Sequence, residues 1–159
     1  MELHESLPLL LLRMSDRVWG KTRFQKLMFL VQAEKTKKGN DREVPFSYFL
    51  YKHGPFSLEL TLTIEKLRDD GFIIEDFKRT STGNPIYTYQ LTESGVEKVD
   101  KEIKTKPEIR SWQTILYRII SDNKTLELSH LVEKSYEVAR SQPFLIGDNI
   151  FQESHYRIV

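Results

Sequence analysis

The side chains with the clearest binding chemistry are lysines and arginines, which gather in two parts of the chain. Residues 17–53 carry nine Lys or Arg against three acids, a net charge of +6. Lys21, Arg23 and Lys26 fall at the start of an expected helix. Lys78-Arg79 falls in an expected loop between two strands. Because such cations bind phosphate, both places are predicted to contact the backbone of double-stranded DNA.

A second set of candidate residues lies on a helix expected to begin at Ser57. Its Thr61, Glu65 and Arg68 lie on the arc away from the core stripe, where a DNA-reading helix would face the groove. Residues 57–77, however, carry two Lys or Arg against six acids, a net charge of −4 that phosphate would repel. The helix therefore leaves two interpretations open, DNA binding and protein binding.

Two leucines of the same helix favour protein binding. Leu58 and Leu62 point well away from the stripe that would pack on the core. A small apolar stripe on an otherwise acidic helix suits contact with protein better than contact with DNA. The alternative function is therefore a protein-binding adaptor or antitoxin-like module without DNA contact.

Catalytic and metal-binding patterns do not stand out. Gly20-Lys21-Thr22 resembles the end of a phosphate loop, but Ser15 stands where that motif needs its first glycine. The histidines lack helical ligand spacing: His4, His53, His130 and His155. No Ser/His/Asp group or carboxylate pair is evident among the dispersed charges. The sequence therefore predicts neither an enzyme nor a cofactor or metal site.

Composition predicts a globular protein of the cytoplasm. A length of 159 residues favours one domain, and 39% hydrophobic residues can supply a core. The absence of cysteine suits a reducing compartment. The leucine-rich residues 7–12 follow two acids and contain Pro8, unlike a signal peptide. Since no stretch approaches the ~20 apolar residues of a membrane span, no membrane contact is expected.

The first half of the chain predicts helices and an aromatic strand. A leucine-rich first helix is expected with Pro8 in its opening turn. Residues 20–36 should form a helix with Gln25 and Gln32 on its polar side. Its apolar stripe comprises Phe24, Leu27, Met28 and Val31. A strand at 46–51 should then end at the Gly54-Pro55 turn.

A helix and a hairpin should follow. Ser57 can cap the helix, and Gly71 can adopt the positive φ that ends it. Strands are expected at 72–78 and 85–91, joined by a polar loop. Helix, glycine stop, strands and loop together predict an α+β fold, a winged helix-turn-helix with a two-to-three-stranded antiparallel wing.

Additional helices should follow the hairpin. Thr92 should cap one that continues to about Lys104. Residues 107–121 form another, and their heptad-like seam predicts a homodimer. The seam comprises Ile109, Trp112, Leu116 and Ile119. We expect residues 1–104 to form the winged-helix domain and residues 105–159 a helical extension that closes the core or joins two copies.

These motifs resemble the YwgA-like winged-helix family and, more remotely, the Panacea-type domains of antitoxins. The resemblance rests on residues 20–30, the turn 54–57, the helix exit 67–72 and the last helix at 131–136. His53 stands where the family commonly has tyrosine. The YwgA-like side of the resemblance implies a transcription regulator, and the Panacea side a protein that neutralises or delivers another protein.

The function favoured by the sequence is a DNA-binding winged-helix transcription regulator. Lys21, Arg23 and Lys26 would bind phosphate, and Lys78-Arg79 would form the tip of the wing. The expected partners are double-stranded DNA and a second copy of the chain. A protein partner remains the alternative.

Overall fold

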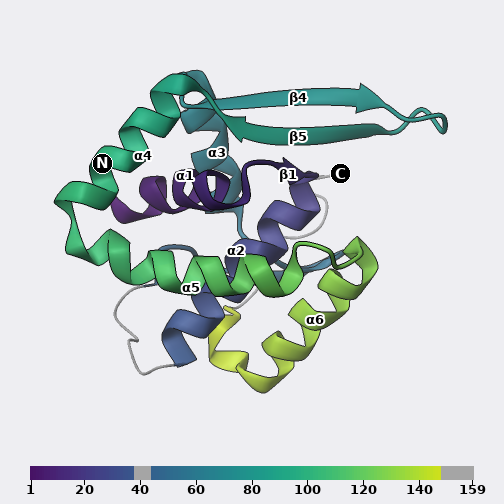
Figure 1. Ribbon diagram of the computed structural model, residues 1–159. Coiled ribbons are helices and arrows are strands. Elements are labelled where there is room, and N and C mark those ends of the chain that lie inside the picture. The colour runs from purple at the N-terminus through teal and green to yellow at the C-terminus, as the bar shows by residue number, and fades with distance from the viewer. Residues whose placement is uncertain (38–43, 148–159) are drawn as a thin grey trace.

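The structure, a computed structural model, describes residues 1–37 and 44–147, which form an α+β fold (Figure 1). Its helices are α1 (Leu3–Ser15), α2 (Lys21–Lys37), α3 (Leu58–Asp69), α4 (Glu93–Thr105), α5 (Pro107–Asn123), α6 (Leu128–Ser141) and the short 3₁₀ helix η1 (Pro143–Leu145). Its strands are β1 (Val18–Trp19), β2 (Phe49–Tyr51), β3 (Gly54–Phe56), β4 (Ile73–Arg79) and β5 (Pro85–Leu91). Lys38 and Arg42, two of the cations counted in residues 17–53, lie outside the described residues, as do the last residues of the predicted extension.

Helix α2 is the central element, because neighbours cover almost all of its surface. It contacts α5, α6, β1 and β3. The predicted apolar stripe is buried, but so are Gln25, Lys26 and Gln32, at 2–4% exposure. The prediction of a polar, solvent-facing side for Gln25 and Gln32 is therefore wrong. Their amides are instead bonded to the backbone of Ser57 and Phe46.

Helix α5 packs inside the same chain. It contacts α1 and α2, and the tryptophan of its seam, Trp112, has 0% exposure. The rest of the seam, Ile109, Leu116 and Ile119, is buried in the same core cluster. The chain's own elements therefore cover the seam, and a homodimer through residues 107–121 stays a prediction.

One core extends across the predicted domain boundary. The buried cluster runs from Leu7 in α1 to Leu145 in η1 and includes Val99 on one side of residue 105 and Trp112 on the other. The helices after residue 105 thus complete the core that the preceding elements begin.

The larger sheet has the strand order β1-β5-β4, with antiparallel neighbours. Its β4–β5 hairpin extends well beyond the helical body (Figure 1). The register pairs Phe77 with Tyr87 and Lys78 with Ile86, so these two pairs lie on opposite faces. The predicted hairpin is confirmed, while the short strand β1 was not anticipated.

The ends of α3 are as the sequence predicted. The Ser57 hydroxyl accepts a hydrogen bond from the Leu60 amide at 3.2 Å, and Gly71 has a φ of +85°. The Gly54-Pro55 segment differs from the prediction, because it forms strand β3 and pairs with β2. Pro8 also differs, since α1 begins at Leu3 and places the proline beyond its first turn.

Candidate functional site

The cations of α3 are neutralised within the chain. Lys66 Nζ lies 2.7 Å from a Glu5 carboxylate oxygen and 3.6 Å from one of Asp70. The guanidinium of Arg68 pairs with Glu75 at 3.0 Å and with Asp69 at 3.3 Å. These partners raise the pKa of both cations. The helix therefore presents no unpaired positive charge to a nucleic acid.

The other predicted groove residues of α3 lie in different surroundings. Thr61 is half-buried and its hydroxyl accepts a hydrogen bond from the Gln25 side-chain amide at 3.0 Å. Glu65 is exposed. Leu62 is 54% exposed, whereas Leu58 is half-buried. The solvent face of α3 thus combines an apolar residue with carboxylates.

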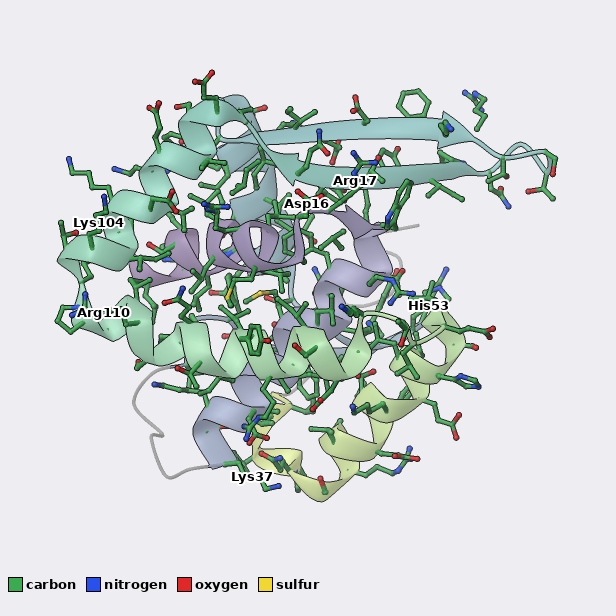
Figure 2. The ribbon with its side chains drawn as sticks, viewed as in Figure 1. Asp16, Arg17, Lys37, His53, Lys104 and Arg110 are labelled. Carbon is green, nitrogen blue, oxygen red and sulfur yellow. The ribbon has the colours of Figure 1, made fainter. Side chains whose placement is uncertain are left out.

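Six cations without carboxylate partners lie around β1, the start of α2, the hairpin and the end of α5. We call them the basic surface; among residues 1–37 and 44–147 none of them forms an ion pair. Its members are Arg17, Lys21, Arg23, Lys78, Arg79 and Lys124. Arg17 lies beside the base of the hairpin, where it donates to the Gln90 side chain at 3.1 Å (Figure 2).

Aromatic side chains accompany these cations. Arg17 and Arg23 line a groove with Lys124, and Trp19 and Tyr117 line the same groove. Trp19 is 54% and Tyr117 66% exposed. Cations beside exposed aromatic rings are typical of surfaces that bind phosphates and stack on bases. No pattern in the sequence indicates this groove, because its residues come from α1, β1, α2 and α5, which only the fold brings together.

The hairpin carries further basic and apolar groups. Lys78 and Arg79 are exposed near its outer end, but they belong to strand β4 and not to the loop that the sequence predicted. Phe77 is 59% exposed, and Lys21 Nζ lies 4.2 Å from the centre of the Tyr87 ring. The start of α2 thus contacts the face of the hairpin that carries Tyr87, whereas Lys78 belongs to the opposite face.

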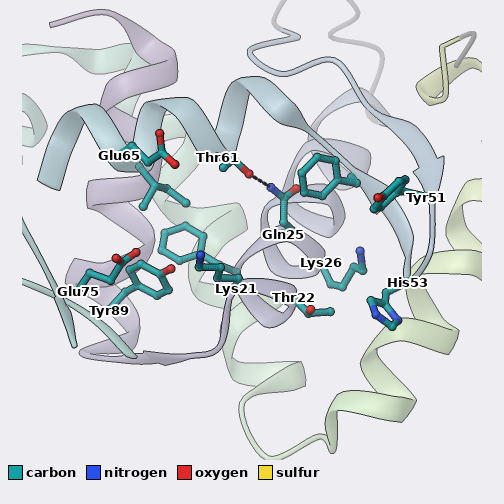
Figure 3. Close-up of a pocket in the computed structure, with 13 residues that line it drawn as sticks. Lys21, Thr22, Gln25, Lys26, Tyr51, His53, Thr61, Glu65, Glu75 and Tyr89 are labelled. Atoms are coloured by element: carbon teal, nitrogen blue, oxygen red, sulfur yellow. Dashed lines mark hydrogen bonds between the residues drawn. The ribbon is translucent and has the colours of Figure 1, made fainter. Parts of the chain in front are cut away.

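A pocket lies between the start of α2, helix α3, the β2–β3 hairpin and the sheet (Figure 3). Its walls include Phe24, Phe56, Ile64, Tyr51 and Tyr89. Predicted site residues also line it, namely Lys21, Lys26, Thr61 and Glu65. The fold thus gathers half of the predicted DNA-binding set around a pocket that no spacing in the sequence indicated.

Lys26 is the unusual residue of this pocket. Lys26 is only 2% exposed, and its Nζ donates a hydrogen bond to the Pro55 carbonyl at 2.7 Å. Burial lowers its pKa to about 8. A buried ammonium without a carboxylate partner costs several kcal/mol. Lys26 thus lines the pocket and is buried, whereas the sequence predicted it at the surface in contact with the DNA backbone.

Gln25 connects the pocket to the cap of α3. Its amide nitrogen donates to the Ser57 carbonyl at 2.9 Å, and its amide oxygen accepts from the Ser57 amide at 2.9 Å. Both ends of the side-chain amide are thereby used in a buried position, where an unpaired polar group is costly. This residue positions α3 and the β3 strand relative to α2.

Among the described residues, one cluster of three side chains is of the kind that can bind a metal ion. Glu2, His4 and Glu5 place their ligand atoms within 4.8 Å of one another. The two carboxylates already serve the capping box of α1, and Glu5 also pairs with Lys66. These contacts stabilise the start of α1, and they explain why the three side chains lie close together.

Comparison with known proteins finds a relative for part of the chain. Over 100 residues the chain is 30% identical to "Uncharacterized protein YwgA" of Bacillus subtilis (strain 168). The match covers 62% of this chain and 55% of that protein. The chain thus spans about half the length of this relative. No protein-family model matches the chain, and no solved structure matches it significantly. Within residues 1–37 and 44–147, no helix is long and apolar enough to cross a membrane.

Proposed function

We propose that this protein is a winged-helix transcription regulator that binds double-stranded DNA through the basic surface. The order α1, β1, α2, α3, β4 and β5, with the sheet order β1-β5-β4, supports a winged-helix arrangement. The hairpin β4–β5 is then the wing. In this proposal phosphate contacts come from the wing, β1 and the start of α2.

The observation that carries the proposal is the separation of paired from unpaired cations. Lys66 and Arg68 of α3 are held by carboxylates, whereas Arg17, Arg23 and Lys78 have no acidic partner in the described parts of the chain. Unpaired cations can replace condensed counterions on DNA, and paired ones cannot do so without losing a salt bridge. The major role of α3 is then to carry the wing, and DNA reading by α3 is not required.

Fluorescence anisotropy with a duplex oligonucleotide at several salt concentrations tests this function. Five phosphate contacts would give a slope of log affinity against log salt of about −4.5. Replacing both Lys78 and Arg79 by Gln should make this slope shallower by about 2. The matched control is Lys104→Gln with Arg110→Gln, since both residues are exposed at the far end of the body from the hairpin (Figure 2). A slope near zero for the wild-type protein contradicts DNA binding.

A protein-binding role is the second candidate, because Leu62 is 54% exposed on α3 beside the exposed Glu65. Exposed apolar side chains with an acidic rim are typical of contacts with protein. In this case Leu62→Ser should release a co-purifying partner, while Thr114→Ser, an exposed change on α5, should not. Unchanged co-purification after Leu62→Ser contradicts the use of this face.

A further inference from the structure

The pocket between α2 and α3 offers a cation for which the protein supplies no anion. An ammonium group has three hydrogen atoms to donate. Lys26 Nζ donates to the Pro55 carbonyl, and within residues 1–37 and 44–147 no carboxylate pairs with it. A negative group bound there would therefore restore a charge partner and use a remaining donor.

The walls of the pocket indicate the rest of the ligand. Phe24, Phe56 and Ile64 are buried apolar residues, and the rings of Tyr51 and Tyr89 also face the space. Small-molecule sites likewise combine apolar walls with a few polar groups.

The other charged groups divide the pocket into two ends. Lys26 and His53 lie at one end, whereas Glu65 and Glu75 lie at the other (Figure 3). Lys21 lies between α2 and the sheet, near Tyr89. Because Glu75 is paired with Arg68, its charge is already compensated. The end at Lys26 is thus the one suited to an anion.

We infer that this pocket binds a small carboxylic acid with an apolar or aromatic body. Its carboxylate accepts a hydrogen bond from Lys26 Nζ, and its body packs against Phe24, Phe56 and Ile64. A monoanion fits better than a phosphate, because a single buried ammonium faces apolar walls, whereas phosphates are bound by several donors. This ligand site shares Lys21 with the basic surface but does not depend on DNA binding.

Phenylacetate is a suitable probe, and phenylacetamide is its neutral match of nearly the same shape. Both are titrated without DNA into the ¹⁵N-labelled protein, and the amide resonances of Lys26, Phe56 and Ser57 are followed by NMR. Phenylacetate is expected to bind at least ~10-fold more tightly than phenylacetamide, since ion-assisted hydrogen bonds are stronger than neutral ones. Equal affinities, or no binding at ~10 mM, overturn the inference.

Two variants distinguish a direct contact with Lys26 from attraction to the overall positive charge of α2. Lys26→Met should abolish the preference for phenylacetate over phenylacetamide. Lys37→Met, an exposed change at the other end of α2, should retain it. A preference that survives in Lys26→Met contradicts the assignment.

A measurement on the unmodified protein covers the case in which Lys26→Met does not fold. The Lys26 side-chain ¹³Cε resonance is titrated with pH in the presence and absence of phenylacetate. A bound carboxylate favours the ammonium form of Lys26, so the pH at the midpoint of its titration should be higher with phenylacetate than without it. An unchanged midpoint overturns the inference whatever the variants do.

Discussion

The Gln25 side-chain amide forms a closed pair of hydrogen bonds with the backbone of Ser57. It accepts from the Ser57 amide and donates to the Ser57 carbonyl, each at 2.9 Å. Ser57 in turn caps α3 through its hydroxyl. The pair therefore determines where α3 begins relative to α2, although the two residues are 32 positions apart.

Removal of this pair should destabilise the protein strongly. Gln25→Met preserves volume but leaves the buried Ser57 amide without its acceptor and the Thr61 hydroxyl without its donor, while the Ser57 carbonyl keeps the Thr61 amide. The expected loss of unfolding free energy is about 2–4 kcal/mol, measured by urea denaturation. Gln113→Met is the control, because Gln113 is only half-buried on α5. Equal stability of the two variants would show that the pair contributes little.

The stability of the protein should depend on pH through Lys26. The pKa of this residue is lowered from 10.5 to about 8 in the folded protein by burial. Below pH 8 both folded and unfolded chains hold the proton, so the cost of the buried charge is fully present. Between pH 8 and 10.5 only the unfolded chain keeps it, and this group's contribution to stability rises with pH.

Comparison of the wild-type protein with Lys26→Met isolates this effect. Other titrating groups cancel in the difference between the two unfolding free energies. From pH 7.5 to pH 10 the wild-type protein should gain about 2 kcal/mol relative to the variant. A difference that stays constant over this range would contradict the lowered pKa.

Trp112 should act as a core residue of the single chain. Its ring has 0% exposure, and Lys35 Nζ lies 5.1 Å from its centre. Trp112→Ala should lower the unfolding free energy by about 3–5 kcal/mol without changing the sedimentation mass under folding conditions. Tyr117→Ala, at a position of the same helix that is 66% exposed, should cost far less. A fall in mass for Trp112→Ala alone would restore the dimer interpretation of α5.

Gly95 should tolerate no side chain. A Cβ placed there would lie 2.1 Å from the Phe72 carbonyl oxygen, so α4 and the chain before β4 would have to separate. Gly95→Ala should therefore destabilise the protein by more than 2 kcal/mol, although alanine favours helices. Ser94→Ala, at the adjacent exposed position, should have little effect in the same thermal unfolding experiment. Similar melting temperatures for the two variants would refute this close contact.

Local features of the chain were determined by the sequence itself. The Ser57 cap, the positive φ of Gly71 and the Thr92 cap depend on neighbouring residues, and each occurs where the pattern predicted it. The runs at 72–78 and 85–91, with a polar loop between them, likewise predicted the hairpin, because its register depends on a short loop.

Tertiary structure alone decided which polar residues are exposed. Helical spacing placed Gln25 on a solvent face and Lys26 in a phosphate-binding set, but α2 is covered on nearly all sides and both are buried. The seam containing Trp112 could equally cover a second copy or its own chain, and contacts with α1 and α2 decided this. A helix pattern specifies which side chains share a face, whereas the partner of that face comes from elements distant in the sequence.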